Sequence, residues 1–299
     1  MIAVGGLLSG RAASAYASPA AACSTGILAR GPCWALRNPY FRFLGASGLS
    51  TLSIYDPIHD GMDRSVRGVR HDFQRPPPAL RRCVHGFWQL KSDGALANEF
   101  ILQAVPDACV NLLFNRLDPD IAAVTALRTR SEALNLGRHF HYVGVQLMPG
   151  AWRGDPRASR DHFVDSAYAG PLPLRAANQA MAQQDFAGMQ IVMAALVAEL
   201  TDRGLISPDP VLERILVSMD AIRTVQDMAT AVHLSPRQLQ RRLTQATGLS
   251  PRELLKVLRV QRSFSQHYLD LYADQSHYIH SFREVTGYTP TRYQQKFHV

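Results

Sequence analysis

Between Leu80 and Trp152 the chain alternates short runs of aromatic and β-branched residues with turn-forming residues. The clearest runs lie at residues 84–90 (VHGFWQL), 109–114 (CVNLLF) and 139–147 (HFHYVGVQL). Runs of this length, bounded by proline and glycine, are typical of β-strands that bury one or both faces. The pattern therefore predicts a β-rich domain in this part of the chain.

From Ala176 onward the apolar residues take a helical spacing. Ile191, Ala194, Ala195 and Ala198 would share one face of a helix that ends near Gly204. The sequence SPDP at 207–210 then indicates a linker. A β-rich part followed by a helical part predicts an α+β protein.

This pattern divides the chain into three segments. We expect residues 1–73 to be a disordered leader or sequence upstream of a wrongly assigned start, because residues 1–61 are rich in Ala, Gly and Ser and show little periodicity. Met62 stands just before patterned sequence and is a candidate start, and the residues before it lack the basic beginning of a secretory signal. Residues 74–206 are expected to form a β-rich sensor or dimerisation domain, and residues 207–299 a separate helical domain.

Two short helices with strong start signals follow the linker. Thr224 and Asp227 have the spacing of a capping box, in which each side chain bonds to the backbone N–H of the other residue. Ser235 and Gln238 repeat the arrangement after a short break, and Pro236 suits the first position of a helix. The sequence therefore predicts a tight helix-turn-helix unit.

The second of these helices has an apolar side and a polar side. Leu239 and Leu243 would face the core, while Arg237, Gln240 and Arg241 project together on the opposite side near the N-terminal end. This is the end that a recognition helix inserts into the major groove of DNA. Arginine pairs there with guanine edges and glutamine with adenine, so the spacing favours DNA binding.

Positive charge gathers around the same helix. Between Met228 and Arg252 the chain has no acidic residue and four arginines, namely Arg237, Arg241, Arg242 and Arg252. Such a cluster suits contacts with phosphates, and we include Arg242 among the expected DNA-binding residues. The alternative interpretation is a helix face that is only solvated. The two adjacent capping boxes favour DNA binding.

The pattern recurs 39 residues further along the chain. A helix cap, two core positions, a glycine that ends the helix and a proline that opens the next one keep their spacing in both copies. The pairs are Ser235 and Asp274, Leu239 and Tyr278, Leu243 and Phe282, Gly248 and Gly287, and Pro251 and Pro290. We interpret them as an internal repeat.

On these residues the chain resembles the AraC/XylS family of transcription regulators, whose DNA-binding domain has two helix-turn-helix units joined by one long helix. The resemblance covers about residues 210–297 and includes GYTPTRY at 287–293, which is similar to the closing signature of the family. It implies base or phosphate contacts from residues in both recognition helices. These are Arg237, Gln240 and Arg241 in the first unit, and Gln275, Ser276, Ile279 and His280 in the second.

The second unit is shorter than the resemblance implies. The offset of 39 compares with roughly fifty residues in the family, so about eleven residues are missing between Phe264 and Tyr272. Recognition helices that read successive turns of one groove lie roughly 34 Å apart. We therefore hypothesise that the first unit is complete, and that the second recognition helix is displaced or only packs against the first.

Charge and cysteine content are consistent with this interpretation. A formal charge of +8 and a pI of about 9.6 favour a polyanionic partner, without choosing between nucleic acid and an acidic membrane surface. The chain has no run of eighteen or more apolar residues, so the sequence predicts no membrane-spanning helix. We interpret the four cysteines as reduced thiols of a cytoplasmic protein, since they show no metal-ligand spacing, and we expect no metal or cofactor. They are Cys23, Cys33, Cys83 and Cys109.

The sequence thus predicts a sequence-specific DNA-binding transcription regulator and not an enzyme. Double-stranded DNA is the expected partner, and a small-molecule effector, RNA polymerase and a second copy of the chain are further candidates; no membrane is expected. One alternative is an enzyme or ligand-binding protein that uses Asp107, Cys109, His139 or His141, although no catalytic motif accompanies them. Another is a regulator remnant in which the missing segment impairs DNA binding.

Overall fold

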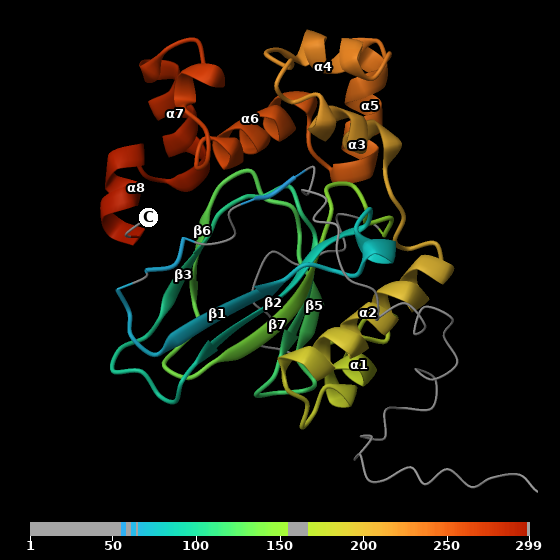
Figure 1. The fold of residues 1–299 in the computed structure, drawn as a ribbon, viewed down its shortest axis with the longest axis vertical. Coiled ribbons are helices and arrows are strands. Elements are labelled where there is room, and N and C mark those ends of the chain that lie inside the picture. The colour runs from blue at the N-terminus through green and yellow to red at the C-terminus, as the bar shows by residue number, and fades with distance from the viewer. Residues whose placement is uncertain (1–54, 58–60, 64, 155–166, 298–299) are drawn as a thin grey trace, which may run out of the picture. The chain divides into compact units, whose positions relative to one another are not determined.

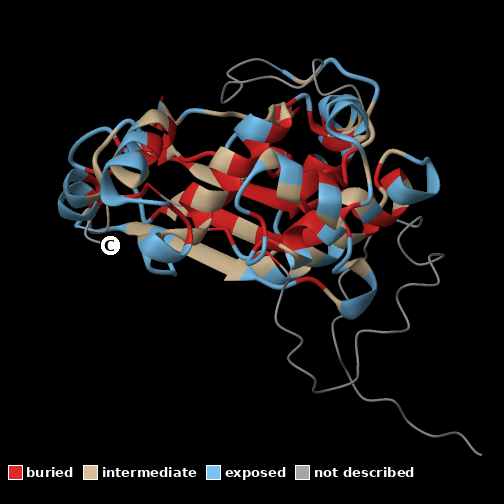
Figure 2. Cartoon of the chain, turned by 90° about the horizontal axis from the view of Figure 1, so that it is seen from above, coloured by how far each residue is buried: buried red, intermediate tan, exposed pale blue. Residues whose placement is uncertain are grey.

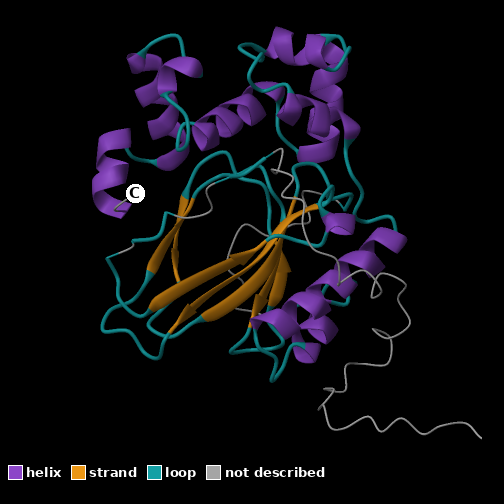
Figure 3. Cartoon of the chain, in the orientation of Figure 1, coloured by secondary structure: helices purple, strands orange, loops and turns teal. Residues whose placement is uncertain are grey.

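The computed structural model of the protein describes residues 55–57, 61–63, 65–154 and 167–297. These residues form seven β-strands followed by eight α-helices, which confirms the α+β class (Figure 1). In Figure 3 the strands lie together, and all the α-helices follow them along the chain. The expectations for residues 1–54, including Cys23 and Cys33, lie outside the described residues.

Five antiparallel strands form the main sheet in the order β1-β2-β7-β4-β5. Their bounds are Val69–Gln74 for β1, Val84–Ser92 for β2, His141–Leu147 for β7, Asn111–Asn115 for β4 and Ala122–Val124 for β5. Strands β3 (Ile101–Ala104) and β6 (Glu132–Asn135) form a separate antiparallel pair. A short 3-10 helix, η3 (Pro78–Leu80), connects β1 to β2. The three runs singled out in the sequence became β2, β4 and β7, which are neighbours in the middle of the sheet.

Two helices cover one side of the main sheet. Helix α1 (Leu174–Ala180) contacts β4 and β5, and α2 (Phe186–Asp202) contacts β2. Ala195 and Ala198 of α2 are buried as predicted, but Ile191 is 40% exposed. The predicted face was therefore partly wrong, because the longer side chains Met193, Leu196 and Leu200 fill the space between the helix and the sheet.

Several described residues before the expected boundary at residue 74 form regular structure or lie in the core. Strand β1 starts at Val69, Met62 is buried, and Gly61 forms a bridge with Gln103. Further upstream, the buried Tyr55 donates a hydrogen bond from its hydroxyl to the carbonyl of Asp107 at 2.8 Å. The sequence pattern missed this segment because β1 is an edge strand that buries no residue completely, so it lacks a strong apolar signal.

The C-terminal part consists of six α-helices and one 3-10 helix. They are α3 (Pro210–Val217), α4 (Val225–Ala231), α5 (Pro236–Thr247), α6 (Pro251–Arg262), η4 (Tyr268–Asp270), α7 (Gln275–Thr286) and α8 (Pro290–Phe297). Helix α6 contacts α4, α5 and α7, and thereby connects the two halves of the repeat (Figure 1). The buried residues shown in Figure 2 include the inward faces of these helices.

The helix starts and ends follow the sequence signals closely. Thr224, Ser235 and Ser250 each form a complete capping box at the start of α4, α5 and α6. Gly248 and Gly287 end α5 and α7 with φ angles of 74° and 81°, in the left-handed region that favours glycine. Both copies of the internal repeat thus end their helix with a glycine in the predicted conformation.

The second half of the repeat lacks the helix that would correspond to α4. Only η4 lies between α6 and α7, and aromatic side chains fill the space instead. Tyr268 stacks on Tyr278 with ring centroids 4.9 Å apart, and Phe264 packs against Phe282 and Tyr293. Helix α7 therefore packs against α6 and this aromatic cluster. None of the described helices is long and apolar enough to cross a membrane.

Leu239→Ala should lower the free energy of unfolding by about 2 to 5 kcal/mol, because Leu239 is completely buried and the substitution leaves a cavity. Gln240→Ala removes a neighbouring exposed side chain of the same helix and should change stability by less than about 0.5 kcal/mol. Urea denaturation of both variants measures the difference. Equal destabilisation by the two substitutions would contradict the placement of the buried face of α5.

Candidate DNA-binding surface

Helix α5 is held by its capping box and by a tight turn from α4. The Ser235 hydroxyl accepts a hydrogen bond from the backbone N–H of Gln238, and the Gln238 side chain accepts one from the backbone N–H of Ser235 at 2.9 Å. His233 takes a positive φ of 56° in the turn, and the N–H of Leu234 donates to the carbonyl of Ala229. Leu239 and Leu243, both completely buried, fix which side of α5 faces the protein.

The opposite side of α5 presents the predicted recognition residues to solvent. Arg237, Gln240 and Arg241 are all exposed. Gln240 donates a hydrogen bond to the Thr244 hydroxyl at 3.0 Å, which orients its amide along the helix. Among the residues that the structure describes, the side chains of Arg237 and Arg241 make no ion pair or hydrogen bond. Their guanidinium groups are therefore available to an external partner.

Arg242 is placed differently from the other arginines of the cluster. Its Nη2 lies 2.7 Å from Oδ2 of Asp209, and its side chain is only 37% exposed. The sequence prediction grouped Arg242 with the DNA-binding residues. The structure instead turns its guanidinium toward the protein, because Arg242 follows Leu239 by three residues and so lies at the edge of the buried face. Direct contact of Arg242 with DNA remains only a prediction.

Asp209 holds Arg242 in place, and the sequence pattern did not single it out. Its Oδ1 accepts hydrogen bonds from the backbone N–H groups of Val211 and Leu212, which caps helix α3. Its Oδ2 receives the guanidinium of Arg242 and, at 3.0 Å, that of Arg153 from the end of the β-rich part. The available signal was an aspartate immediately before Pro210, an arrangement typical of a helix start.

In the second half of the repeat, α7 exposes part of its predicted surface. Gln275, Ser276 and His280 are exposed, whereas Ile279 is partly buried. The Nε2 of His280 lies 3.9 Å from a carboxylate oxygen of Glu284, which also pairs with Lys256 on α6. His280 thus lies near a carboxylate, which reduces the local positive charge.

The C-terminal end of α7 is attached to the β-rich part. The backbone N–H of Ser131 donates to the carbonyl of Val285, and the Ser131 hydroxyl donates to the carbonyl of Thr286, both at 2.7 Å. Ser131 directly precedes β6. These bonds satisfy backbone carbonyls that the end of a helix leaves without a partner. The position of α7 therefore depends on residues that precede it by about 150 positions in the sequence.

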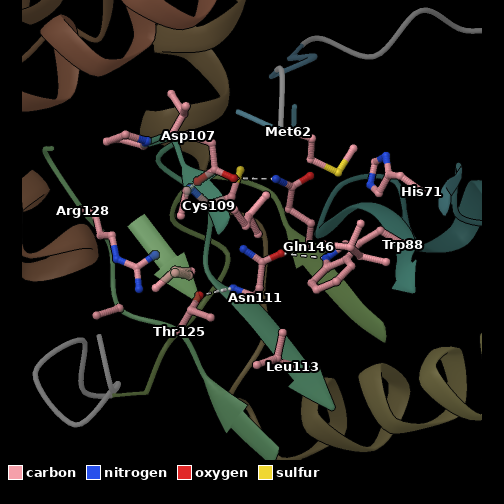
Figure 4. A pocket seen from close by; sticks show the side chains of 17 residues that line it. Met62, His71, Trp88, Asp107, Cys109, Asn111, Leu113, Thr125, Arg128 and Gln146 are labelled. Carbon is pink, nitrogen blue, oxygen red and sulfur yellow. Dashed lines mark hydrogen bonds between the residues drawn. The ribbon is translucent and has the colours of Figure 1, made fainter. Parts of the chain in front are cut away.

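The four residues proposed for the enzyme alternative do not form one site. Asp107 and Cys109 line a cavity of about 130 Å³ in the β-rich part, which neither His139 nor His141 lines (Figure 4). Burial, together with the charges of Lys91 and Arg116, lowers the pKa of His141 to about 4, so its imidazole is neutral near pH 7. His139 is exposed and precedes β7. The two histidines are therefore separate from the cavity that Asp107 and Cys109 line.

Cys109 is buried, with 2% of its surface exposed, and burial and the nearby Asp107, in that order of importance, raise the pKa of its thiol well above the usual value. We expect iodoacetamide at pH 8 to modify Cys109 at least about tenfold more slowly in the folded protein than in urea, because burial disfavours the thiolate. Peptide-resolved mass spectrometry measures both rates, with the urea-unfolded chain as the reference. Modification at the same rate in both states would show that Cys109 is a reactive thiol.

Comparisons with known proteins match part of this architecture. A family described as a domain of unknown function, DUF6597, matches residues 73–166. This range contains β2 to β7 and the last two residues of β1. No curated protein matches the sequence. Among solved structures, the chain is similar to a crystal structure of an apo ToxT variant from Vibrio cholerae. The two share 10% sequence identity with a TM-score of 0.37, over 77% of this chain and 98% of that one, a degree of likeness that assigns no function.

Proposed function

We propose that this protein is a sequence-specific DNA-binding transcription regulator that uses α5 as its main recognition helix. The observation that carries the proposal is the two-sided character of α5. Its leucines are completely buried, while Arg237, Gln240 and Arg241 are exposed on the other side of a capped helix. A helix anchored in this way can enter the major groove without leaving the protein core.

The chemistry of the exposed residues suits both kinds of DNA contact. An arginine guanidinium can donate two hydrogen bonds to one guanine, and the glutamine amide can pair with adenine in the major groove. The positive charge of the chain favours association with phosphates and makes affinity fall as salt rises. Base contacts would then give sequence preference to an interaction whose strength is largely electrostatic.

The resemblance of residues 210–297 to AraC/XylS regulators supports the same function. In that family a second unit reads an adjacent stretch of DNA, and here no α-helix equivalent to α4 lies between α6 and α7 in the described structure. We infer that α5 makes most of the contacts with DNA bases, while Gln275, Ser276 and His280 of α7 mainly contact the sugar-phosphate backbone of the DNA. The β-rich part would sense a small-molecule effector or mediate dimerisation, and the regulator would act in the cytoplasm.

Arg241→Ala should weaken binding to the cognate site by about 1 to 3 kcal/mol and relax base preference at the position it contacts. Arg67→Ala is the matched control, since it removes the same charge from an exposed site that precedes β1. Fluorescence anisotropy with the DNA flanking the gene, titrated at several salt concentrations, measures both affinity and its salt dependence. Equal behaviour of the two variants would refute the assignment of α5.

A footprint on the preferred DNA site should cover one major groove strongly and the neighbouring groove weakly, because only the first unit is complete. Gln275→Ala combined with His280→Ala should then lower affinity less than Arg241→Ala alone. Hydroxyl-radical footprinting of the wild-type chain and of the variants tests this. Strong protection of two successive grooves on one face of the DNA, lost in the double variant, would mean that α7 is a full reader.

A further inference from the structure

A partly enclosed cavity of about 130 Å³ lies in the β-rich part, between residues of the main sheet and of the β3–β6 pair (Figure 4). Its lining includes the apolar residues Leu113 and Leu134 and the indole of Trp88. It also includes side chains with hydrogen-bonding groups, among them Asp107 and Asn111. A mostly apolar cavity with a few oriented polar groups is typical of a site for a small molecule.

The polar groups are held in fixed orientations by neighbouring residues. The indole N–H of Trp88 donates to Oδ1 of Asn111 at 3.0 Å. The carboxylate of Asp107 accepts hydrogen bonds from the Gln146 amide at 2.6 Å and from the backbone N–H of Cys109 at 2.9 Å. The Oε1 of Gln146 in turn lies 2.5 Å from Nδ1 of the buried His85. Asp107 therefore meets the cavity as a positioned acceptor.

The charges of the lining distinguish between ligands of opposite sign. A carboxylate attracts donors and cations and repels another carboxylate. The cationic side chain that lines the cavity, Arg128, lies within 3.1 Å of Glu132, so its charge is already balanced by an acid. An anionic ligand would gain little from Arg128 and would be repelled by Asp107. A ligand that carries an ammonium group would instead be attracted by the Asp107 carboxylate and would not depend on the charge of Arg128.

Size restricts the ligand further. An apolar protein cavity of about 150 Å³ holds one benzene molecule. The cavity here is of similar volume, so it admits about one six-membered ring with a short polar substituent. The indole of Trp88 and the leucines would pack on the ring.

We propose that this cavity binds a small monocyclic amine, whose ammonium group donates hydrogen bonds to Asp107 while its ring packs against Trp88, Leu113 and Leu134. Binding of the amine does not depend on the proposed regulator function. Only its role as an effector rests on that function. Pro106, which also lines the cavity, accepts a hydrogen bond at 2.7 Å from the side chain of Gln261 on α6. An amine bound next to Asp107 would therefore lie close to α6, the helix that connects the two halves of the repeat.

The test uses the full chain without DNA and a pair of matched probes, cyclohexylamine and cyclohexanecarboxylate. Isothermal titration calorimetry should show saturable binding of the amine at least about tenfold tighter than binding of the carboxylate. Asp107→Asn should abolish this preference, while Asp93→Asn, which neutralises an exposed carboxylate in an ion pair with Arg70, should preserve it. Equal binding of the two probes by the wild type, or no binding of the amine, would overturn the proposal.

The pH dependence of binding provides a test that needs no variant. Burial raises the pKa of Asp107 to about 6, whereas the amine stays protonated throughout the range studied. Affinity for the amine should therefore fall as the pH is lowered from 7.5 to 5, because Asp107 becomes neutral. The other titratable groups around Asp107 and the cavity are Tyr55, His85, Cys109, His71 and Arg128. An affinity that stays constant over this range would contradict recognition by Asp107.

A second variant keeps the test valid if Asp107→Asn does not fold. Ala126→Leu adds volume at a partly exposed position of the lining and should exclude the amine without removing any hydrogen bond of Asp107. Full retention of amine binding in this variant would place the ligand elsewhere. Because the titrations contain no DNA, they are independent of α5. A chain that binds DNA but not the amine overturns this inference alone, and the opposite result overturns the regulator function alone.

Discussion

The carboxylate of Asp209 joins three parts of the chain that are separate in sequence. One of its oxygens caps α3, and the other is shared by the guanidinium groups of Arg153, at the end of the β-rich part, and Arg242, on α5. The carboxylate is almost completely buried, so leaving it without a cationic partner would be unfavourable. This interaction therefore helps to fix the position of α5 relative to the sheet.

This arrangement separates two roles that neighbouring arginines could share. Arg241 is exposed and available to a partner, whereas Arg242, one residue later, is committed to Asp209. One residue along a helix corresponds to a rotation of about 100°, which is enough to move a side chain from the solvent side to the edge of the core. The buried leucines of α5 and the Asp209 carboxylate together determine that rotation. The exposed surface of α5 is thus a consequence of how its other side is held.

The second half of the repeat shows what happens when a supporting helix is missing. Helix α7 keeps the cap and the terminal glycine of its counterpart, and it has the partly buried Tyr278 and the buried Phe282 where α5 has leucines. Its support comes instead from stacked tyrosines, from α6 and from the hydrogen bonds of Ser131 to its last carbonyls. The β-rich part therefore contributes to the position of α7, and the bond from Gln261 to Pro106 adds a second link near the cavity.

Local signals in the sequence were sufficient to determine the helix starts, the helix-ending glycines, the three central strands and the exposed side of α5. Each of these depends on residues within about one or two helical turns, or on an uninterrupted apolar run, so short-range chemistry decides them. The sequence did not reveal the edge strand β1, the inward turn of Arg242 or the solvent exposure of Ile191. It also did not reveal the cavity around Asp107. These features depend on contacts between residues that lie tens of positions or more apart, such as Tyr55 with Asp107 and Arg153 with Asp209. Only the tertiary structure decides them, because the energy of a buried carboxylate or an edge strand depends on what the rest of the chain places beside it.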